Sequence, residues 1–448
     1  MRRRIPALVA ALLLSLTLSG CGSFHFEFDP ERLYALPELP AKYTELNAQI
    51  NAVLEDGAEY AAPTSGTNIQ PVQLTDLDGD GQQEAVAFFR KAEDEKPLKI
   101  HIFSANGDSY VRSAVIEGSG AAVNSVVYSD LDGDGRTELI VGWRVNAELQ
   151  ALSVYALPPG GPRELLRSVS YVRYSNADLN GDGLQELVVL RSDEEGEGVA
   201  DYYDWKNGSL APQSPARISV TMAELSQQGR LSAGTLQGGV PALFVTGVTE
   251  QSGAVTDILA VRNGELTNIV LSEATGVSGE IAPFYSLYPM DINNDGLTEV
   301  PFPVFAGTEG AQTLQRVDWR SYGLDGVGET VAGTYHCVED RWYLQLPEAW
   351  VGRVQAERSG SSVESSVTFY IQSETGERGA AILRITALSG SGREIRATRG
   401  NRFPLSRQSA SIYTAELPEK APWEHAMTAE EVRTAFGLIA RDWIPGEN

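Results

Sequence analysis

An acidic nine-residue motif recurs four times in the 448-residue chain, beginning at Asp76, Asp130, Asp178 and Asp291. Each copy has Asp or Asn at positions 1, 3 and 5, Gly at position 6 and Glu at position 9, and an apolar run follows. The first three copies lie about 50 residues apart, and the last interval is about twice as long. Periods of this length indicate solenoids, arrays or propellers, so we expect a repeat architecture.

Each repeat contains short strand-like runs, such as "VQLTDL", "AVAFF", "LKIHIFS" and "YVRSAVI", separated by turns. Four short strands are the content of one propeller blade. Residues 231–248 have the Gly-rich turn and the apolar strand but no candidate ligand carboxylates, so we interpret them as a degenerate fifth unit. The sequence predicts a mainly β fold, a β-propeller of about five four-stranded blades, one degenerate, over residues 65–335. A blade needs neighbours on both faces, so we expect the units to close in a ring.

The two ends of the chain differ from the repeats. Residues 22–64 combine a polar, proline-containing tether with a helix from about Ala41 to Asp56. The apolar stripe of this helix is Leu46, Ile50, Val53 and Leu54, and Gly57 is placed to end it. Residues 336–448 read as a small α+β domain. Its last helix is expected to begin with a capping box of Thr428 and Glu431 and to carry Val432, Phe436, Ile439 and Trp443 on one face.

Residues 1–21 have the layout of an export signal, with Arg2–Arg4 before a short apolar run. The tetrad Leu18–Cys21 is similar to a bacterial lipobox, which implies cleavage and lipidation of Cys21. A plain signal peptide is the alternative. A lipid-anchored, extracytoplasmic position at the cell membrane is the expectation. Cys337 is the only other cysteine in the sequence, so lipidation of Cys21 would leave no intramolecular disulfide.

The formal net charge of −25 argues against nucleic acid as a partner, because a nucleic-acid surface requires a basic face. An anionic membrane surface would also repel the body of the protein. The predicted lipid would therefore do the anchoring.

The acidic motif differs from an EF-hand, which needs a bidentate Glu at position 12. Position 12 is apolar in all four copies. Carboxylate or amide oxygens at positions 1, 3, 5 and 9 and a backbone carbonyl at position 7 can instead surround Ca²⁺ in a tight turn. The candidate metal ligands are Asp76, Asp78, Asp80, Gln82 and Glu84; Asp130, Asp132, Asp134, Arg136 and Glu138; Asp178, Asn180, Asp182, Leu184 and Glu186; and Asp291, Asn293, Asp295, Leu297 and Glu299.

Oxygen-only ligands exclude zinc and copper as the intended metal, and Mg²⁺ prefers fewer protein ligands. The structural alternative is that the motifs are ordinary Asp-Gly turns. Crowded carboxylates repel one another without a cation, so we expect calcium binding to be linked to folding.

The repeated motif followed by an apolar strand resembles the FG-GAP/VCBS repeats of integrin α-chain propellers and of many secreted bacterial proteins. The resemblance covers residues 65–335 and implies a calcium-binding propeller. The complete layout, from lipobox to C-terminal domain, is similar to VCBS-repeat lipoproteins of Gram-positive anaerobic bacteria. That resemblance implies no particular activity.

We assign no catalytic residue, because the sequence contains no nucleophile elbow, zincin motif or phosphate loop. His336 and Cys337 are adjacent, and adjacent strand residues point to opposite faces. A carboxylate pair for glycoside hydrolysis is defined in space and stays open. The aromatic segments 201–208 and 316–323 offer rings to a sugar or peptide, or they are ordinary strand residues.

The resulting hypothesis is a lipid-anchored, extracytoplasmic binding or scaffolding protein with a calcium-stabilised propeller and an unknown protein or glycan ligand. The alternative is a cell-surface polysaccharide lyase or glycosidase on a propeller scaffold. A third possibility is a receptor or envelope-assembly partner that binds through residues 341–448.

Overall fold

The apolar runs on either side of each acidic motif pair as antiparallel strands in the computed structural model. The structure describes residues 43–439 except 107–108, 250–252, 273, 284–285, 307–312 and 374–376. The predicted signal peptide, Cys21 and the tether up to residue 42 lie outside the described residues. No helix among the described residues is long and apolar enough to cross a membrane.

Five antiparallel sheets follow one another along the chain, and each is a four-stranded blade, with one further short strand in every blade except the second. Blade 1 contains β1 (Glu59–Tyr60), β2 (Val72–Thr75), β3 (Glu84–Arg90), β4 (Leu98–Asn106) and β5 (Ser109–Gly118). Blade 2 contains β6 (Ala122–Ser129), β7 (Glu138–Arg144), β8 (Gln150–Ala156) and β9 (Arg163–Tyr171). Blade 3 contains β10 (Arg173–Ala177), β11 (Glu186–Ser192), β12 (Gly198–Lys206), β13 (Ser209–Pro212) and β14 (Ala216–Arg217).

Helix α3 (Met222–Gln227) precedes blade 4, which contains β15 (Arg230–Leu236), β16 (Val240–Val248), β17 (Gly253–Arg262), β18 (Glu265–Asn268) and β19 (Ile281–Pro283). Blade 5 contains β20 (Val300–Ala306), β21 (Thr313–Tyr322), β22 (Gly328–Cys337), β23 (Trp342–Gln345) and β29 (Phe436–Leu438). The prediction of a mainly β fold with propeller-type blades, one of them degenerate, is confirmed. Blade 4 is the degenerate unit.

The second strand of each acidic hairpin packs on both of its faces. In β3, Val86 and Phe88 join a cluster with Val126 and Val141 of blade 2, while Phe89 points to the opposite face. This is why the run after each motif is continuously apolar instead of alternating with polar residues. Similar clusters join blades 2 and 3, blades 3 and 4, and blades 4 and 5.

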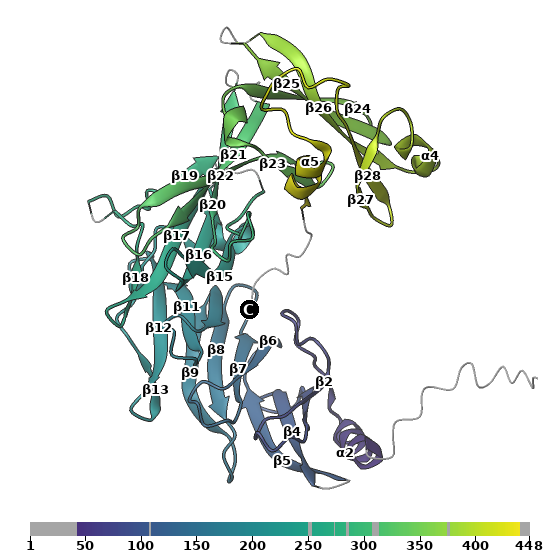
Figure 1. The fold of residues 1–448 in the computed structure, drawn as a ribbon. Helices are drawn as coiled ribbons and strands as arrows, with labels where there is room; N and C mark the ends of the chain where they lie inside the picture. Colours follow the sequence, from purple (N-terminus) through teal and green to yellow (C-terminus); the bar gives the residue numbers. More distant parts are fainter. Residues whose placement is uncertain are drawn as a thin grey trace, which may run out of the picture.

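The blades form an open arc instead of the expected closed ring (Figure 1). Helix α2 (Thr44–Glu55) packs Leu46 and Ile50 against Phe89 and Phe103, so it covers the face of blade 1 that a closing blade would need. Among the described residues, blades 1 and 5 share no hydrophobic cluster. Helix α2 thus acts as a terminal cap of the kind that open repeat arrays require.

The C-terminal sheet continues the arc beyond blade 5 (Figure 1). It contains β24 (Val354–Ser361), β25 (Glu364–Gln372), β26 (Arg378–Ser389), β28 (Ser411–Glu416) and β27 (Phe403–Arg407), with η3 (Glu348–Trp350) and α4 (Arg393–Ala397). Strand β22 runs across the domain boundary expected at residues 335/336, and blade 5 continues to Gln345.

The last helix is shorter than its apolar periodicity predicts. The Thr428 and Glu431 capping box forms, but α5 spans only Ala429–Ala435. Phe436–Leu438 then becomes β29 and pairs with β23, because this pairing buries Phe436 against Trp342 in the cluster between blade 5 and the C-terminal sheet. The expected helical positions Phe436 and Ile439 are therefore not helical, and Trp443 lies outside the described residues.

Candidate metal centres

The first acidic loop, between β2 and β3, is organised by hydrogen bonds to its own carboxylates. The two carboxylate oxygens of Asp76 accept from the backbone N–H groups of Gly79 and Gly81 at 2.8 and 2.9 Å. A Glu84 oxygen accepts from the backbone N–H of Leu77 at 2.9 Å. Both ends of the loop therefore turn inward and bring carboxylates from positions 1 and 9 together.

Two of these hydrogen bonds, to the Glu at position 9 and from the Gly at position 6, recur in the other three loops, which we number 2, 3 and 4 in chain order. Glu138 accepts from Leu131 at 2.8 Å, Glu186 accepts from Leu179 at 2.7 Å, and Glu299 accepts from Ile292 at 3.1 Å. In each loop the first Asp also accepts from the backbone N–H of the Gly at position 6. Four segments far apart in the sequence therefore fold alike.

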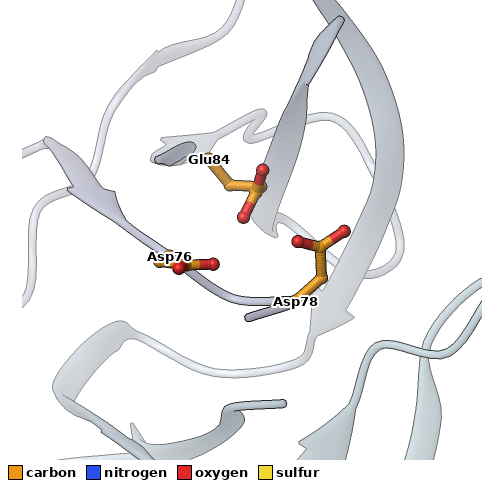
Figure 2. Close-up of side chains that lie close together, drawn as sticks. All are labelled: Asp76, Asp78 and Glu84. Atoms are coloured by element: carbon orange, nitrogen blue, oxygen red, sulfur yellow. The ribbon is translucent and has the colours of Figure 1, made fainter. Parts of the chain in front are cut away.

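Carboxylate oxygens converge in three of these loops. They lie within 4.8 Å of one another in three trios, which are Asp76, Asp78 and Glu84; Asp130, Asp132 and Glu138; and Asp178, Asp182 and Glu186. Figure 2 shows the first trio facing a common space. Among the described residues, loop 4 forms no such trio of carboxylates. Loops 1, 2 and 3 could therefore hold a metal ion in this conformation.

The predicted ligands outside these three trios form hydrogen bonds within their own loops or are backbone carbonyls. Oxygens of Asp80 and Asp134, at position 5 of loops 1 and 2, accept from the backbone N–H at position 7. The Asn180 and Asn293 amides donate to Asp182 and Asp295 at 3.0 and 2.9 Å. The carbonyl ligands at Gln82, Arg136, Leu184 and Leu297 stay predictions.

The glutamate at position 9 is buried in every loop, with at most 3% of its surface exposed. Burial raises the pKa of Glu138, Glu186 and Glu299, nearby aspartates add to the rise and backbone hydrogen bonds oppose it, and the resulting pKa of each is about 7. One carboxylate oxygen each of Glu186 and Glu299 is buried without a hydrogen-bond partner. A buried, unpartnered anionic oxygen is costly unless a cation neutralises it, so the residues fit a hard metal ion.

Successive loops also touch one another. The backbone N–H of Thr137 in loop 2 donates to the Leu77 carbonyl in loop 1 at 2.9 Å, and Arg136 reaches Asp78 at 3.7 Å. Gly79 lies against the backbone of Gly135, and a Cβ on Gly133 would be 3.0 Å from the Leu184 side chain. Loops 1, 2 and 3 therefore form a continuous row across the junctions between blades.

These contacts were not anticipated from the sequence. The available signal was Gly at position 4 in the first three loops, Gly79, Gly133 and Gly181, where loop 4 has Asn294. Gly79 and Gly133 combine a positive φ with close approach of the neighbouring loop, which is a combination that favours glycine.

We predict that calcium stabilises the protein much more at pH 8 than at pH 5. In the metal-free fold, Glu138, Glu186 and Glu299 have a higher pKa than in the unfolded chain. Their protonation therefore stabilises the fold fully below the ordinary pKa of 4.5, and this stabilisation is lost as the pH rises through about 7. Calcium requires the ionised carboxylates, so its effect grows through the same window. Melting temperatures at both pH values, with calcium and with chelator, test this.

The Glu138→Gln variant provides the control for this pH dependence, because its amide oxygen can still accept from Leu131 but cannot titrate. Its calcium response should depend less on pH than that of the unaltered chain. An equal calcium response at pH 5 and pH 8 in the unaltered chain would contradict the prediction.

The residues considered for catalysis do not form a nucleophilic site. Burial lowers the pKa of His336 to about 3 and raises the pKa of the Cys337 thiol to about 12. The His336 ring stacks on Tyr343, whereas Cys337 lies near Asp340. A neutral buried thiol away from an imidazole is a weak nucleophile, so His336 and Cys337 do not form a thiol–imidazole pair of the catalytic type.

The two aromatic segments mostly serve the core. Tyr202 and Tyr203 in segment 201–208 are buried in the clusters on the two faces of blade 3. Trp319 and Tyr322 in segment 316–323 are fully buried in blade 5. These rings are unavailable to an outside ligand.

One stretch of the chain, which contains two of the four acidic loops, matches a known family of repeats. Residues 76–141, which contain loops 1 and 2, match the model of the FG-GAP-like repeat. This part of the chain is similar to FG-GAP-like repeats in the loops and strands described above. No curated protein matches the chain.

Solved structures with a low level of similarity include a β-xylosidase/α-arabinofuranosidase from a compost microbial metagenome, with 12% identity, a TM-score of 0.25 and coverage of 61% of this chain and 98% of that one. A lectin from Aleuria aurantia has 13% identity and a TM-score of 0.24 over 74% of this chain and 94% of its own. The polysaccharide lyase Uly1 has 9% identity and a TM-score of 0.29 over 71% and 77%. TM-scores this low carry no argument about function.

Proposed function

We propose that the protein is a calcium-stabilised binding or scaffolding protein, held outside the cytoplasm by a lipid on Cys21. The observation that carries the calcium assignment is the set of buried position-9 glutamates, two of which have a buried oxygen without a partner. The oxygen-only surroundings and the converging carboxylates are the ligand set that Ca²⁺ prefers.

The position of the loops explains why calcium would have a structural role. Loops 1 to 3 lie where neighbouring blades meet, and loop 2 is hydrogen-bonded directly to loop 1. A metal ion in such a loop would order the junction between blades and keep the arc in one shape. The arc would then present a rigid surface to a protein or glycan partner.

The anchoring part of the proposal predicts that the Cys21→Ser variant is released from the membrane. A lipid on Cys21 is supported only by the Leu18–Cys21 tetrad and the apolar run before it. Cell fractionation with metabolic labelling by a radioactive fatty acid should place the label and the protein in the membrane fraction. Loss of both in the Cys21→Ser variant is expected, whereas label retained by the variant would refute anchoring at this residue.

A further inference from the structure

A cavity of about 190 Å³ lies beside loop 1, between blades 1 and 2. One part of its wall is made by Ile102, Leu157, Pro158 and Pro159, which are apolar. Another part is made by polar side chains of Asp78, Glu84, Ser104, Ser113 and Arg136. A small cavity with one apolar wall and a few fixed polar groups has the general character of a ligand site.

Some donors and acceptors in the polar wall are not fully occupied by hydrogen bonds within the protein. The Arg136 side chain is partly exposed, and its guanidinium lies 3.7 Å from Asp78, which is too far for a hydrogen bond. The Ser104 hydroxyl donates to the Ser113 hydroxyl at 2.7 Å, and the Ser113 hydroxyl donates to the Ile102 carbonyl at 3.3 Å, so both hydroxyl oxygens keep free lone pairs. A ligand with several hydroxyl groups could satisfy these atoms.

We propose that this cavity binds a single neutral sugar ring. This proposal rests on the binding function proposed above and specifies the chemical class of its ligand. A sugar ring has an apolar C–H face, which fits the wall of Ile102, Leu157 and the two prolines. Its hydroxyl groups can donate to Asp78 and accept from Arg136. An anionic ligand is disfavoured because the four carboxylates of loop 1, Asp76, Asp78, Asp80 and Glu84, outnumber the two positive charges of one calcium ion and the single charge of Arg136.

The position of the cavity links sugar binding to loop 1. Asp78 and Glu84 line the cavity and are also members of the first converging trio. Arg136 comes from loop 2, so the polar wall exists only while blades 1 and 2 are docked through the Thr137 and Leu77 contact. Sugar binding should therefore weaken when calcium is removed.

The test is a titration of the full chain, kept in a zwitterionic detergent that contains no sugar, with methyl glycosides of neutral hexoses and with a hexuronate. Saturation-transfer NMR and calorimetry would measure binding with excess calcium. We expect a dissociation constant of about 1 mM for at least one neutral glycoside. The Arg136→Ala variant should lose about tenfold or more in affinity, as expected for a hydrogen bond to a charged group, while its backbone carbonyl stays in loop 2.

Two further variants make the outcome decisive. Ala114→Leu fills the cavity without altering Arg136 and should also weaken binding, whereas Arg167→Ala removes an exposed arginine that pairs with Glu164 on blade 2 and should leave it unchanged. Absence of binding by any neutral glycoside, binding of the hexuronate alone, or binding unaffected by both cavity variants would overturn the proposal. A calcium-dependent melting shift in the same samples would show that the calcium assignment survives even if the sugar proposal fails.

Discussion

Removal of calcium is expected to lower the melting temperature of the chain without residues 1–21 by about 10 °C or more. A metal ion at 100 times its dissociation constant contributes about 2.7 kcal/mol at each site, and several sites act along one array. The loops hold buried glutamates that repel their neighbouring aspartates once the ion leaves. Thermal unfolding with excess calcium and with a chelator measures the difference.

The control for this experiment replaces the first aspartate of each loop, Asp76, Asp130, Asp178 and Asp291, by alanine. These aspartates accept backbone hydrogen bonds and are also predicted metal ligands, so the variant should be less stable and should also lose its calcium response. Equal melting of the unaltered chain in calcium and in chelator would refute the metal assignment. The acidic loops would then have to be considered as recognition or catalytic groups.

The Gly79→Ala variant should be destabilised by about 1–3 kcal/mol more than the Gly81→Ala variant. Both glycines have a positive φ, 75° and 85°, so both variants incur a similar left-handed strain. A Cβ on Gly79 would overlap the Gly135 carbonyl of loop 2, whereas a Cβ on Gly81 meets nothing within 4 Å. The difference between the two variants therefore isolates the contact between loops.

Chemical denaturation in excess calcium measures both variants. Gly133→Ala should fall between them, because its neighbour is the flexible Leu184 side chain at 3.0 Å. Equal destabilisation by Gly79→Ala and Gly81→Ala would show that loops 1 and 2 do not touch in solution. The proposed coupling between metal sites and blade docking would then lose its structural basis.

Much of the local structure was predictable because it depends on residues within the same short segment. The Asp and Gly spacing fixes how each loop turns, and the Thr428 and Glu431 box correctly predicts where α5 begins. The end of α5 was not predictable, because Phe436 could pack its apolar side chain on the core from either a longer helix or a strand. Pairing of β29 with β23 decided in favour of a strand.

The glutamates at position 9 illustrate the same limit within the candidate site. Their spacing identified them as ligands, but their burial and the unpartnered oxygens of Glu186 and Glu299 depend on the strands packed around them. Arg136 was expected to contribute only a backbone carbonyl. Its side chain lies in the cavity beside loop 1 because blade 2 docks against blade 1.

The sequence by itself determined the repeat, the acidic loops, the mainly β composition and the degenerate unit, because each depends on residues close together in the chain. The tertiary structure decided that the blades form an open arc (Figure 1). The face of a terminal blade can be covered by any apolar surface of suitable shape. Here Leu46 and Ile50 of α2 bury Phe89 and Phe103, so blade 1 has no free face left for ring closure.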